Sequence, residues 1–267
     1  MSTPAKLYGA AETAKFSYNF LSDNFEHFKK LAMPLLPVLF LSTLMSGALE
    51  KGKNADNPPL LIALAIIFGI AGFFYMTAFV ISWHRAVVMG PSESNKVNPL
   101  KMTKSEWSFL FTGFLIFFIM LGIGMACGLV LGMISKISMP LAVIGGIALL
   151  IAMFIYTARL YLFFPAKASG TDITLMEALK MGRGMSAKIV GSLFIGALPV
   201  AITAGLTVAV VGLITIYIIG VPEAMTSRFI FSFVITPFQL FFNLAGAAIG
   251  VGILSRYYMW AAEHNKA

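Results

Sequence analysis

The sequence has little charge for its length. Only 11% of its 267 residues are Asp, Glu, Lys or Arg, whereas 59% are hydrophobic and the mean hydropathy is +0.89. Soluble domains carry about 25% charged residues. Because a water-soluble fold of this size could not cover so much apolar surface, the composition excludes a soluble globular protein and predicts an integral membrane protein.

Cysteine and the motifs of catalysis are also scarce. The single cysteine, Cys127, lies inside an apolar run, so no intramolecular disulfide can form, and the three histidines lack the spacing of metal ligands. No Gly-x-Ser-x-Gly elbow or paired-carboxylate motif occurs. Residues 47–53 depart from a phosphate-binding loop because Asn54 stands where Ser or Thr is required. We therefore predict no catalytic residue, no metal and no cofactor.

Long apolar runs are what the sequence has in abundance. A helix needs about 20 apolar residues to cross the hydrocarbon core with its backbone groups bonded internally. The runs predict an all-α, polytopic bundle of six transmembrane helices in one domain, residues 1–267. The predicted spans are 31–49, 60–88, 107–134, 140–164, 189–219 and 229–262. Pro237 removes a backbone donor from the last span, which leaves open whether residues 229–235 form a separate short helix.

The basic residues predict the orientation of the chain. Fifteen of the 19 lysines and arginines fall on the side of the predicted spans that also holds both termini. Short cytoplasmic loops retain positive charge, so both termini are expected in the cytoplasm. The formal net charge of +8 is then a signature of topology, and no nucleic acid is expected as a partner.

Arginine recurs at one place in alternate spans. The second, fourth and sixth predicted spans end near Arg85, Arg159 and Arg256, each of them among aromatic residues. Each odd-numbered span follows a short polar or amphipathic segment. The pattern predicts three pseudo-repeated hairpins that enter and leave on one face. The alternative is that arginine and aromatic residues mark any inner membrane interface, where they snorkel and anchor.

Two amphipathic segments are expected at the membrane surface. The first is an interfacial helix within residues 1–30, and the second begins at Thr174. Asp23 with Glu26, and Thr174 with Glu177, have capping-box spacing, and the first pair predicts a helix that runs on into the first span. Basic residues on these segments favour anionic lipid, with a protein partner as the alternative. The predicted lipid or partner surface comprises Lys15, Lys29, Lys30, Arg85, Arg159, Lys180, Arg183 and Arg256.

Glycine is spaced for close packing of helices. Gly124, Gly128 and Gly132 lie four residues apart in the third span, and Gly246 and Gly250 do so in the sixth. Small residues at this spacing let two helix backbones approach closely. Contact within one subunit is the ordinary interpretation, and a seam between copies of the chain is the alternative.

A family resemblance rests on a few short motifs. Arg159-Leu-Tyr-Leu-Phe-Phe-Pro165, followed by Glu177 and the entry to a new span at Gly184, resembles a pattern of YciC-type proteins. These include membrane domains attached to some bacterial glycerophosphodiester phosphodiesterases. The segment around Tyr18 before the first span is similar too. The resemblance implies a six-helix protein of the bacterial inner (plasma) membrane with no catalytic centre in its membrane part.

Together these features predict a non-enzymatic membrane protein, either a lipid-interacting scaffold or an accessory subunit of a larger membrane assembly. Its expected partners are anionic membrane lipids and a membrane protein or a second copy. A small transporter or permease is the alternative, and an enzyme acting on lipid head groups comes third. The predicted spans contain no acidic residue of the kind coupled transport commonly uses. A transporter predicts a water-accessible cavity near Gln239, Asn243 or Arg159, whereas a scaffold predicts tight packing there.

Overall fold

The computed structural model describes residues 8–51, 59–94, 97–219 and 225–264, so the first seven residues of the expected interfacial segment lie outside it. Within these ranges the regular structure consists of eleven helices and no strand, which confirms the predicted all-α polytopic bundle. Five helices are long and apolar enough to cross a membrane, and a bent helix pair would make a sixth span. The chain is therefore a multi-pass membrane protein.

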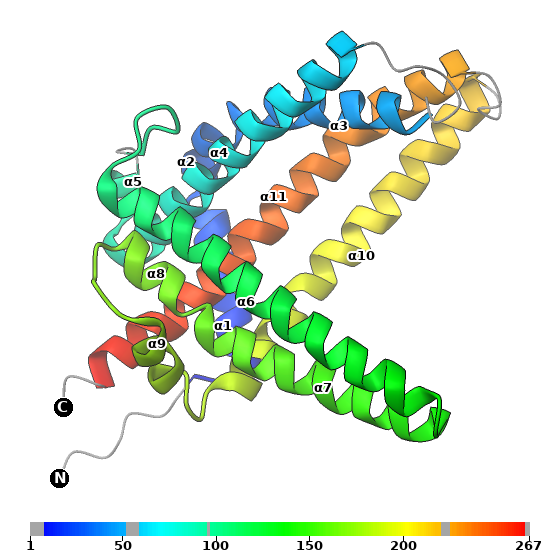
Figure 1. Ribbon diagram of the computed structural model, residues 1–267. Helices are drawn as coiled ribbons and strands as arrows, with labels where there is room; N and C mark the ends of the chain where they lie inside the picture. Colours follow the sequence, from blue (N-terminus) through cyan, green and yellow to red (C-terminus); the bar gives the residue numbers. More distant parts are fainter. Residues whose placement is uncertain (1–7, 52–58, 95–96, 220–224, 265–267) are drawn as a thin grey trace.

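Three long helical hairpins account for most of the chain (Figure 1). They pair α3 (Leu35–Lys51) with α4 (Pro59–Met89), α6 (Lys104–Ser135) with α7 (Met139–Leu160), and α10 (Ser186–Ile219) with α11 (Met225–His264). The short helices are α1 (Ala10–Asp23), α2 (Phe25–Ala32), α5 (Pro91–Ser94), α8 (Phe163–Ala168) and α9 (Leu175–Met181). The fourth candidate span, Met139–Ala168, contains the predicted residues 140–164, although a short turn after Leu160 separates α7 from α8 within it.

The first span is broken where the sequence predicted one continuous helix. α2 ends at Ala32 and α3 begins at Leu35, and the two helices are bent by 47°. Pro34 explains the break, because proline lacks the backbone donor that would continue the helix. The predicted capping box at Asp23 and Glu26 is also wrong. α2 begins after Asn24, whose side-chain amide donates instead to the Phe20 carbonyl at 2.9 Å.

The last span is a single helix, so residues 229–235 do not form a separate one. α11 runs from Met225 to His264 through Pro237. At 1.5 Å per residue its 40 residues extend about 60 Å, about twice the ~30 Å of a hydrocarbon core. A large part of α11 must therefore lie outside the hydrocarbon.

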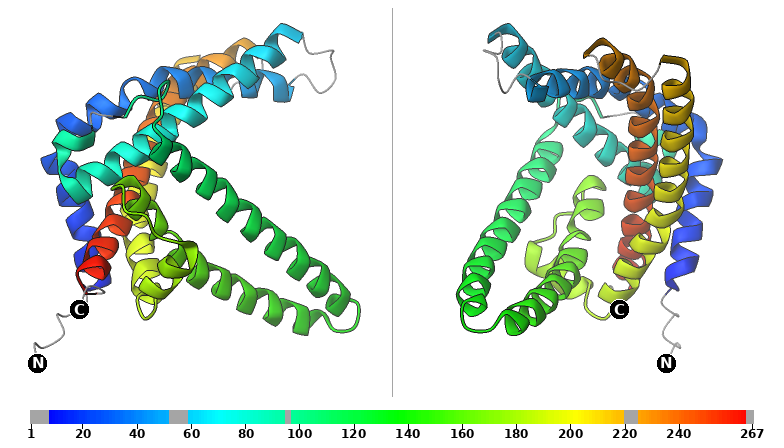
Figure 2. Two further views of the ribbon diagram at one scale, coloured as in Figure 1. Left: turned by 60° about the vertical axis from the view of Figure 1, so that its left-hand side comes forward. Right: turned by 90° about the vertical axis from the view of Figure 1, so that its right-hand side faces the viewer.

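The hairpins diverge from a common end of the molecule. In two views the α3–α4 and α10–α11 hairpins lean to one side and the α6–α7 hairpin to the other, so the ribbon is V-shaped (Figures 1 and 2). We call the common end the polar base; it comprises α1, α8, α9, the first turns of α6 and α10 and the last turns of α4, α7 and α11. The α6–α7 hairpin, Lys104–Leu160, is called the open arm.

The hydrophobic core lies mainly in and beside the polar base. One buried cluster gathers Ala14 of α1, Ile189 of α10 and Tyr257 of α11. A second joins Phe28 and Trp83 to the middle of α11. α1 packs along α10 and α11 with Thr13, Ala14 and Ser17 buried, and so it is a member of the bundle instead of the separate surface helix expected from the sequence.

The open arm buries little of itself. In the most apolar stretch of α6 only 6% of the residues are buried, as in those of α4 and α10, against 50% in that of α11. Large side chains such as Phe111, Leu129 and Phe154 are more than half exposed. A small buried cluster at the polar base, formed by Phe109, Ile81 and Ala168, joins the arm to α4 and α8. Since water does not tolerate an apolar surface of this extent, the arm is built for a lipid environment.

Candidate functional site: the polar base and the open arm

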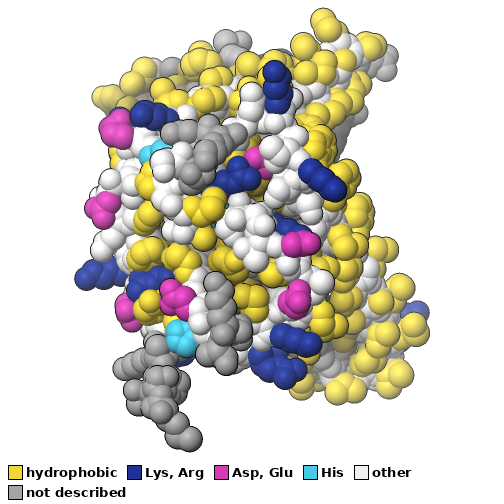
Figure 3. All heavy atoms as spheres, turned by 90° about the vertical axis from the view of Figure 1, so that its left-hand side faces the viewer, with side chains coloured by type: hydrophobic (Ala, Val, Ile, Leu, Met, Phe, Trp, Pro, Cys, Tyr) yellow, Lys and Arg dark blue, Asp and Glu magenta, His cyan; other side chains and the backbone are white. Residues whose placement is uncertain are grey.

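The charged side chains gather on the polar base. Seen from that side, Lys, Arg, Asp and Glu are spread together over one face, and apolar side chains dominate its upper and right-hand edges (Figure 3). Both signs of charge are present, so the base is a network of possible ion pairs instead of a uniformly cationic plate. Which cations remain free for a ligand depends on their individual partners.

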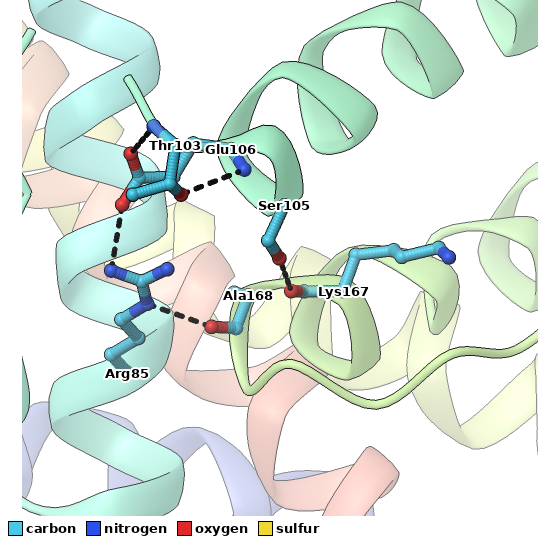
Figure 4. A network of polar contacts seen from close by, with 6 residues as sticks. All are labelled: Arg85, Thr103, Ser105, Glu106, Lys167 and Ala168. Carbon is cyan, nitrogen blue, oxygen red and sulfur yellow. Dashed lines mark hydrogen bonds and ion pairs between the residues drawn. The ribbon is translucent and has the colours of Figure 1, made fainter. Parts of the chain in front are cut away.

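Arg85 is held inside the molecule. Its Nη1 donates to Glu106 Oε1 at 2.9 Å, and its Nε donates to the Ala168 carbonyl at 2.8 Å (Figure 4). The Glu106 side chain is 2% exposed and that of Arg85 13%. This buried pair ties the end of α4 to the start of α6 and to α8. Breaking a buried ion pair is costly because the remaining charge is left uncompensated.

The same carboxylate also caps α6. Thr103 N donates to Glu106 Oε2 at 2.7 Å, and the Thr103 hydroxyl accepts from Glu106 N at 3.4 Å. Reciprocal bonds of this kind satisfy two backbone donors at a helix start. Both oxygens of Glu106 are therefore engaged, one in the cap and one with Arg85.

Arg159 is likewise engaged within the chain. Its Nε donates to Ser186 Oγ at 2.6 Å, and its guanidinium lies 5.7 Å from the centre of the Tyr156 ring. Gly182 packs directly on the arginine stem, since a Cβ at that position would lie 2.7 Å from Arg159 Cγ. The end of α7 is thus tied to the start of α10.

Arg256 completes the series. It donates from Nη1 to the Glu12 carbonyl at 3.1 Å and pairs with Glu12 Oε1 at 3.4 Å. Its guanidinium lies 4.1 Å from the Tyr8 ring centre and 4.4 Å from that of Phe16. The last hairpin is therefore tied to the first helix, as the first hairpin is to the second and the second to the third. The three arginines have different partners, and the pseudo-repeat stays a prediction.

Buried polar groups fasten the helices of the base to one another. His84 Nδ1 lies 2.8 Å from Ser255 Oγ, and these residues immediately precede Arg85 and Arg256. Trp83 Nε1 donates to the Ala248 carbonyl at 2.8 Å, and Ser17 Oγ donates to the Ile249 carbonyl at 2.7 Å. No group of three or more potential His, Cys, Asp or Glu metal ligands occurs among the described residues.

The predicted lipid or partner surface therefore divides in two. Arg85, Arg159 and Arg256 are bound within the chain, so their assignment to that surface is corrected to an architectural role. Lys29 pairs with Glu26 at 2.7 Å. The remaining predicted cations are exposed: Lys30 on α2, and Lys15, Lys180 and Arg183 on the base.

Among the described residues, three apolar recesses lie along the open arm. The smallest, of about 280 Å³, lies between Cys127 of α6 and Leu149 of α7. The other two share residues with each other. One, of about 340 Å³, is lined by Phe73 and Thr77 of α4 and by Phe109, Gly113 and Phe117 of α6. The other, of about 400 Å³, lies between α6 and α7 and shares Gly113 and Phe117 with the first.

The threonine hydroxyl groups in these recesses already have partners. Thr77 donates to the Phe73 carbonyl at 2.9 Å, and the Thr157 hydroxyl lies 3.8 Å from the Met120 sulfur. Such walls suit hydrocarbon better than a polar ligand, because they offer little unsatisfied hydrogen-bonding capacity.

The predicted packing glycines do not behave alike. On α11, Gly246 and Gly250 face α10. A Cβ at Gly246 would lie 3.7 Å from Val200, and a Cβ at Gly250 would lie 3.9 Å from Leu193. On α6, a Cβ at Gly124 would lie 3.8 Å from Met153, but Gly128 and Gly132 have no neighbour within 4 Å of such an atom among the described residues. The expectation that Gly128 and Gly132 pack within one subunit is therefore wrong.

Two polar residues in the apolar stretch of α11 are exposed on the surface of the molecule. The Gln239 and Asn243 side chains are exposed, in contrast to the tight packing that a scaffold predicted there. Arg159, the third position of that comparison, is packed. Exposure of Gln239 and Asn243 departs from the scaffold prediction, whereas packing of Arg159 agrees with it, so the three positions together do not decide between a scaffold and a transporter.

Glu106 is the central residue that the sequence prediction overlooked. Thr103-x-x-Glu106 has the same capping spacing as Thr174-x-x-Glu177, which the structure confirms as a capping box at the start of α9. The spacing could have revealed the cap, but no local signal indicates that Arg85 would reach the same carboxylate from another helix.

The geometry thus defines a class: a multi-pass helical membrane protein with an internally bonded polar base and a lipid-exposed arm. Comparison of the chain with protein-family models, curated proteins and solved structures finds no match. The functional argument therefore rests on the residues themselves.

Proposed function

We propose that the chain is a non-enzymatic protein of the bacterial inner membrane that binds lipid along its open arm and acts as a scaffold or accessory subunit. The YciC-type resemblance and the orientation with both termini in the cytoplasm belong to this proposal. The observation that carries it is the pair of apolar recesses at Gly113 and Phe117 on an arm whose large side chains are exposed.

The difference between the polar base, which is bonded internally, and the open arm, which is exposed, supports the proposal. Arg85 and Arg159 connect successive hairpins and Arg256 ties the last hairpin to α1, which gives the base fixed links instead of reactive groups. The open arm carries no comparable set of links in its outer part. It therefore offers acyl chains both a large apolar surface and recesses between helices.

Filling the shared recess tests the proposal. A Cβ at Gly113 would lie 3.5 Å from Phe164 Cε1, so alanine fits there and Gly113→Leu should occupy the recess. We expect this variant to retain fewer lipid molecules than the wild-type chain when both are purified whole in mild detergent. Native mass spectrometry counts the bound lipids.

Gly122→Leu is the matched control. Gly122 lies on the same helix as Gly113, but a Cβ at Gly122 would have no described neighbour within 4 Å. It should leave the retained lipid unchanged. Equal lipid retention by Gly113→Leu and the wild-type chain would contradict a lipid-binding arm.

Transport remains a second candidate because Gln239 and Asn243 are exposed one helical turn apart beside Pro237. If they line a water path, Asn243→Cys in a Cys127→Ala background should react with a membrane-impermeant maleimide in sealed vesicles. If they face lipid, the cysteine should remain unlabelled until detergent is added.

A further inference from the structure

A polar recess of about 370 Å³ lies at the foot of the open arm. It is separate from the apolar recesses and shares no lining residue with them. Its walls come from the first turns of α6, from the end of α8 and from the loop that follows. The polar side chains that line it are Lys104, Ser105, Ser108, Lys167, Thr171 and Asp172.

The charges of this recess are unequal. It holds two ammonium groups and one carboxylate, and Lys167 pairs with Asp172. That pairing lowers the pKa of Asp172, first through the hydrogen bond from Lys167 and then through its charge. Lys167 is further fixed by the Phe163 ring, whose centre lies 5.3 Å from its Nζ. Within the recess, Lys104 supplies the charge that this pair does not balance.

Two donors of the recess have no partner among the described residues. The Lys104 ammonium and the Ser108 hydroxyl make no hydrogen bond or ion pair there. They lie four residues apart on α6 and so on the same face of the helix. Ser105, by contrast, donates to the Lys167 carbonyl at 3.4 Å (Figure 4). A cation and a hydroxyl side by side are suited to an anionic oxygen group such as phosphate.

The face of α6 that carries these donors becomes apolar further along. Leu115 and Ile119 follow Lys104 and Ser108 at helical spacing, and they are 51% and 40% exposed. The polar recess therefore lies at the base of a lipid-exposed stripe. A ligand that matches both parts has an anionic head and an apolar tail.

We propose that the recess binds the phosphate of an anionic glycerophospholipid, with Lys104 and Ser108 as its donors and the acyl chains along Leu115 and Ile119. This site rests on the proposed function and deepens it by naming the lipid class and the residues that select it. Lys167 and Asp172 balance each other, so Lys104 supplies the net positive charge of the site. A zwitterionic head group gains less from this net positive site.

The test measures binding of dioleoylphosphatidylglycerol and dioleoylphosphatidylcholine to the whole purified chain in detergent. We expect tighter binding of the anionic lipid to the wild-type protein. Lys104→Ala should weaken it about fivefold, the usual effect of one basic residue near an anionic lipid surface. Ser108→Ala should weaken it less, since it removes a neutral donor.

Lys101→Ala is the matched control, because Lys101 is exposed close by but does not line the recess. An equal loss in Lys101→Ala and Lys104→Ala would overturn the site in favour of diffuse surface charge. Displacement of the lipid by excess inorganic phosphate would overturn it in favour of a soluble anion. Unchanged affinity in both Lys104→Ala and Ser108→Ala, with wild-type thermal stability, would also refute it.

The two proposals can fail separately. If Gly113→Leu still lowers lipid retention while the Lys104 and Ser108 variants bind normally, the arm binds lipid but the head-group site is wrong. If the Lys104 variant loses anionic lipid while Gly113→Leu retains the wild-type amount, the head-group site stands and the acyl recess is wrong.

Discussion

The helices α6 and α11 are both long and apolar, yet they lie in opposite environments. α6 is the more apolar of the two, and only 6% of its most apolar stretch is buried, against 50% for α11. In water the more apolar helix would be expected inside. In a membrane, lipid solvates apolar side chains as well as protein does, so burial goes to helices with small residues and matching hydrogen bonds.

The glycines of the two helices show the same difference at single positions. Gly252 of α11 lies directly against Ser17 of α1, whereas Gly128 of α6 has open space around it among the described residues. Ser17 also bonds to the backbone of α11. Four-residue glycine spacing therefore permits close packing but does not create it; a partner helix with a complementary surface is needed as well.

The largest effect is expected where the open arm joins the polar base. Arg85→Ala leaves the Glu106 carboxylate buried without its partner, which should destabilise the fold by about 3–5 kcal/mol. Thermal unfolding in detergent measures this loss. Arg183→Ala, which removes an exposed arginine, is the control and should have little effect.

A double variant separates charge from packing at this junction. Arg85→Met combined with Glu106→Leu should recover much of the lost stability, because buried ion pairs can often be replaced by apolar pairs. A double variant as unstable as Arg85→Ala would mean that the bond from Arg85 to the Ala168 carbonyl or the Glu106 cap of α6, and not the ion pair, holds the arm.

An intermediate effect is expected from adding one methyl group to each of two glycines. Gly252→Ala forces α1 away from α11 because its Cβ meets Ser17, and overpacking of this kind costs about 1–3 kcal/mol. Gly128→Ala should change stability by no more than about 0.5 kcal/mol, as an open surface site does. If the two variants melt alike in detergent, α1 is not packed as described. A loss confined to Gly128→Ala would instead indicate a seam between copies.

The smallest effect concerns acid sensitivity at α9. Hydrogen bonds from the Thr174 backbone and hydroxyl lower the pKa of Glu177 below its ordinary value of 4.5. Because the folded pKa is the lower one, the cap is fully effective above that value and is lost as pH falls through the folded pKa. The protection of amides at the start of α9 against hydrogen exchange, relative to the unfolded chain at the same pH, should therefore fall upon acidification below about pH 4.5. In Glu177→Gln this acid response should be much weaker; an unchanged response would contradict the role of the cap.

Local signals predicted the elements of the fold better than they predicted the candidate sites. The apolar runs indicated the long helices because a span needs only length and composition. The capping spacing indicated the start of α9 because Thr174 and Glu177 interact within one turn. Pro34 is visible in the sequence as a site where the first span can bend, but proline is also tolerated inside membrane helices, as at Pro237 of α11, so the residue alone does not distinguish a break from a continuous helix.

The roles of the cations could not be read from the sequence. Arg85 and Lys104 both stand near predicted span ends, but Arg85 is bonded to Glu106 and Ala168 whereas Lys104 has no partner among the described residues. Such a difference depends on residues that are distant in the chain and meet only after the helices pack.

Composition and periodicity by themselves determined that this protein is helical and spans a membrane several times, since hydropathy and backbone hydrogen bonding act over short stretches of chain. Only the tertiary structure decided that α1 joins the bundle, that two arginines connect successive hairpins while a third ties the last hairpin to α1, and that α6 and α7 remain open. Those outcomes depend on shape and bonding between distant residues, because lipid gives no apolar helix a hydrophobic reason to choose a particular neighbour.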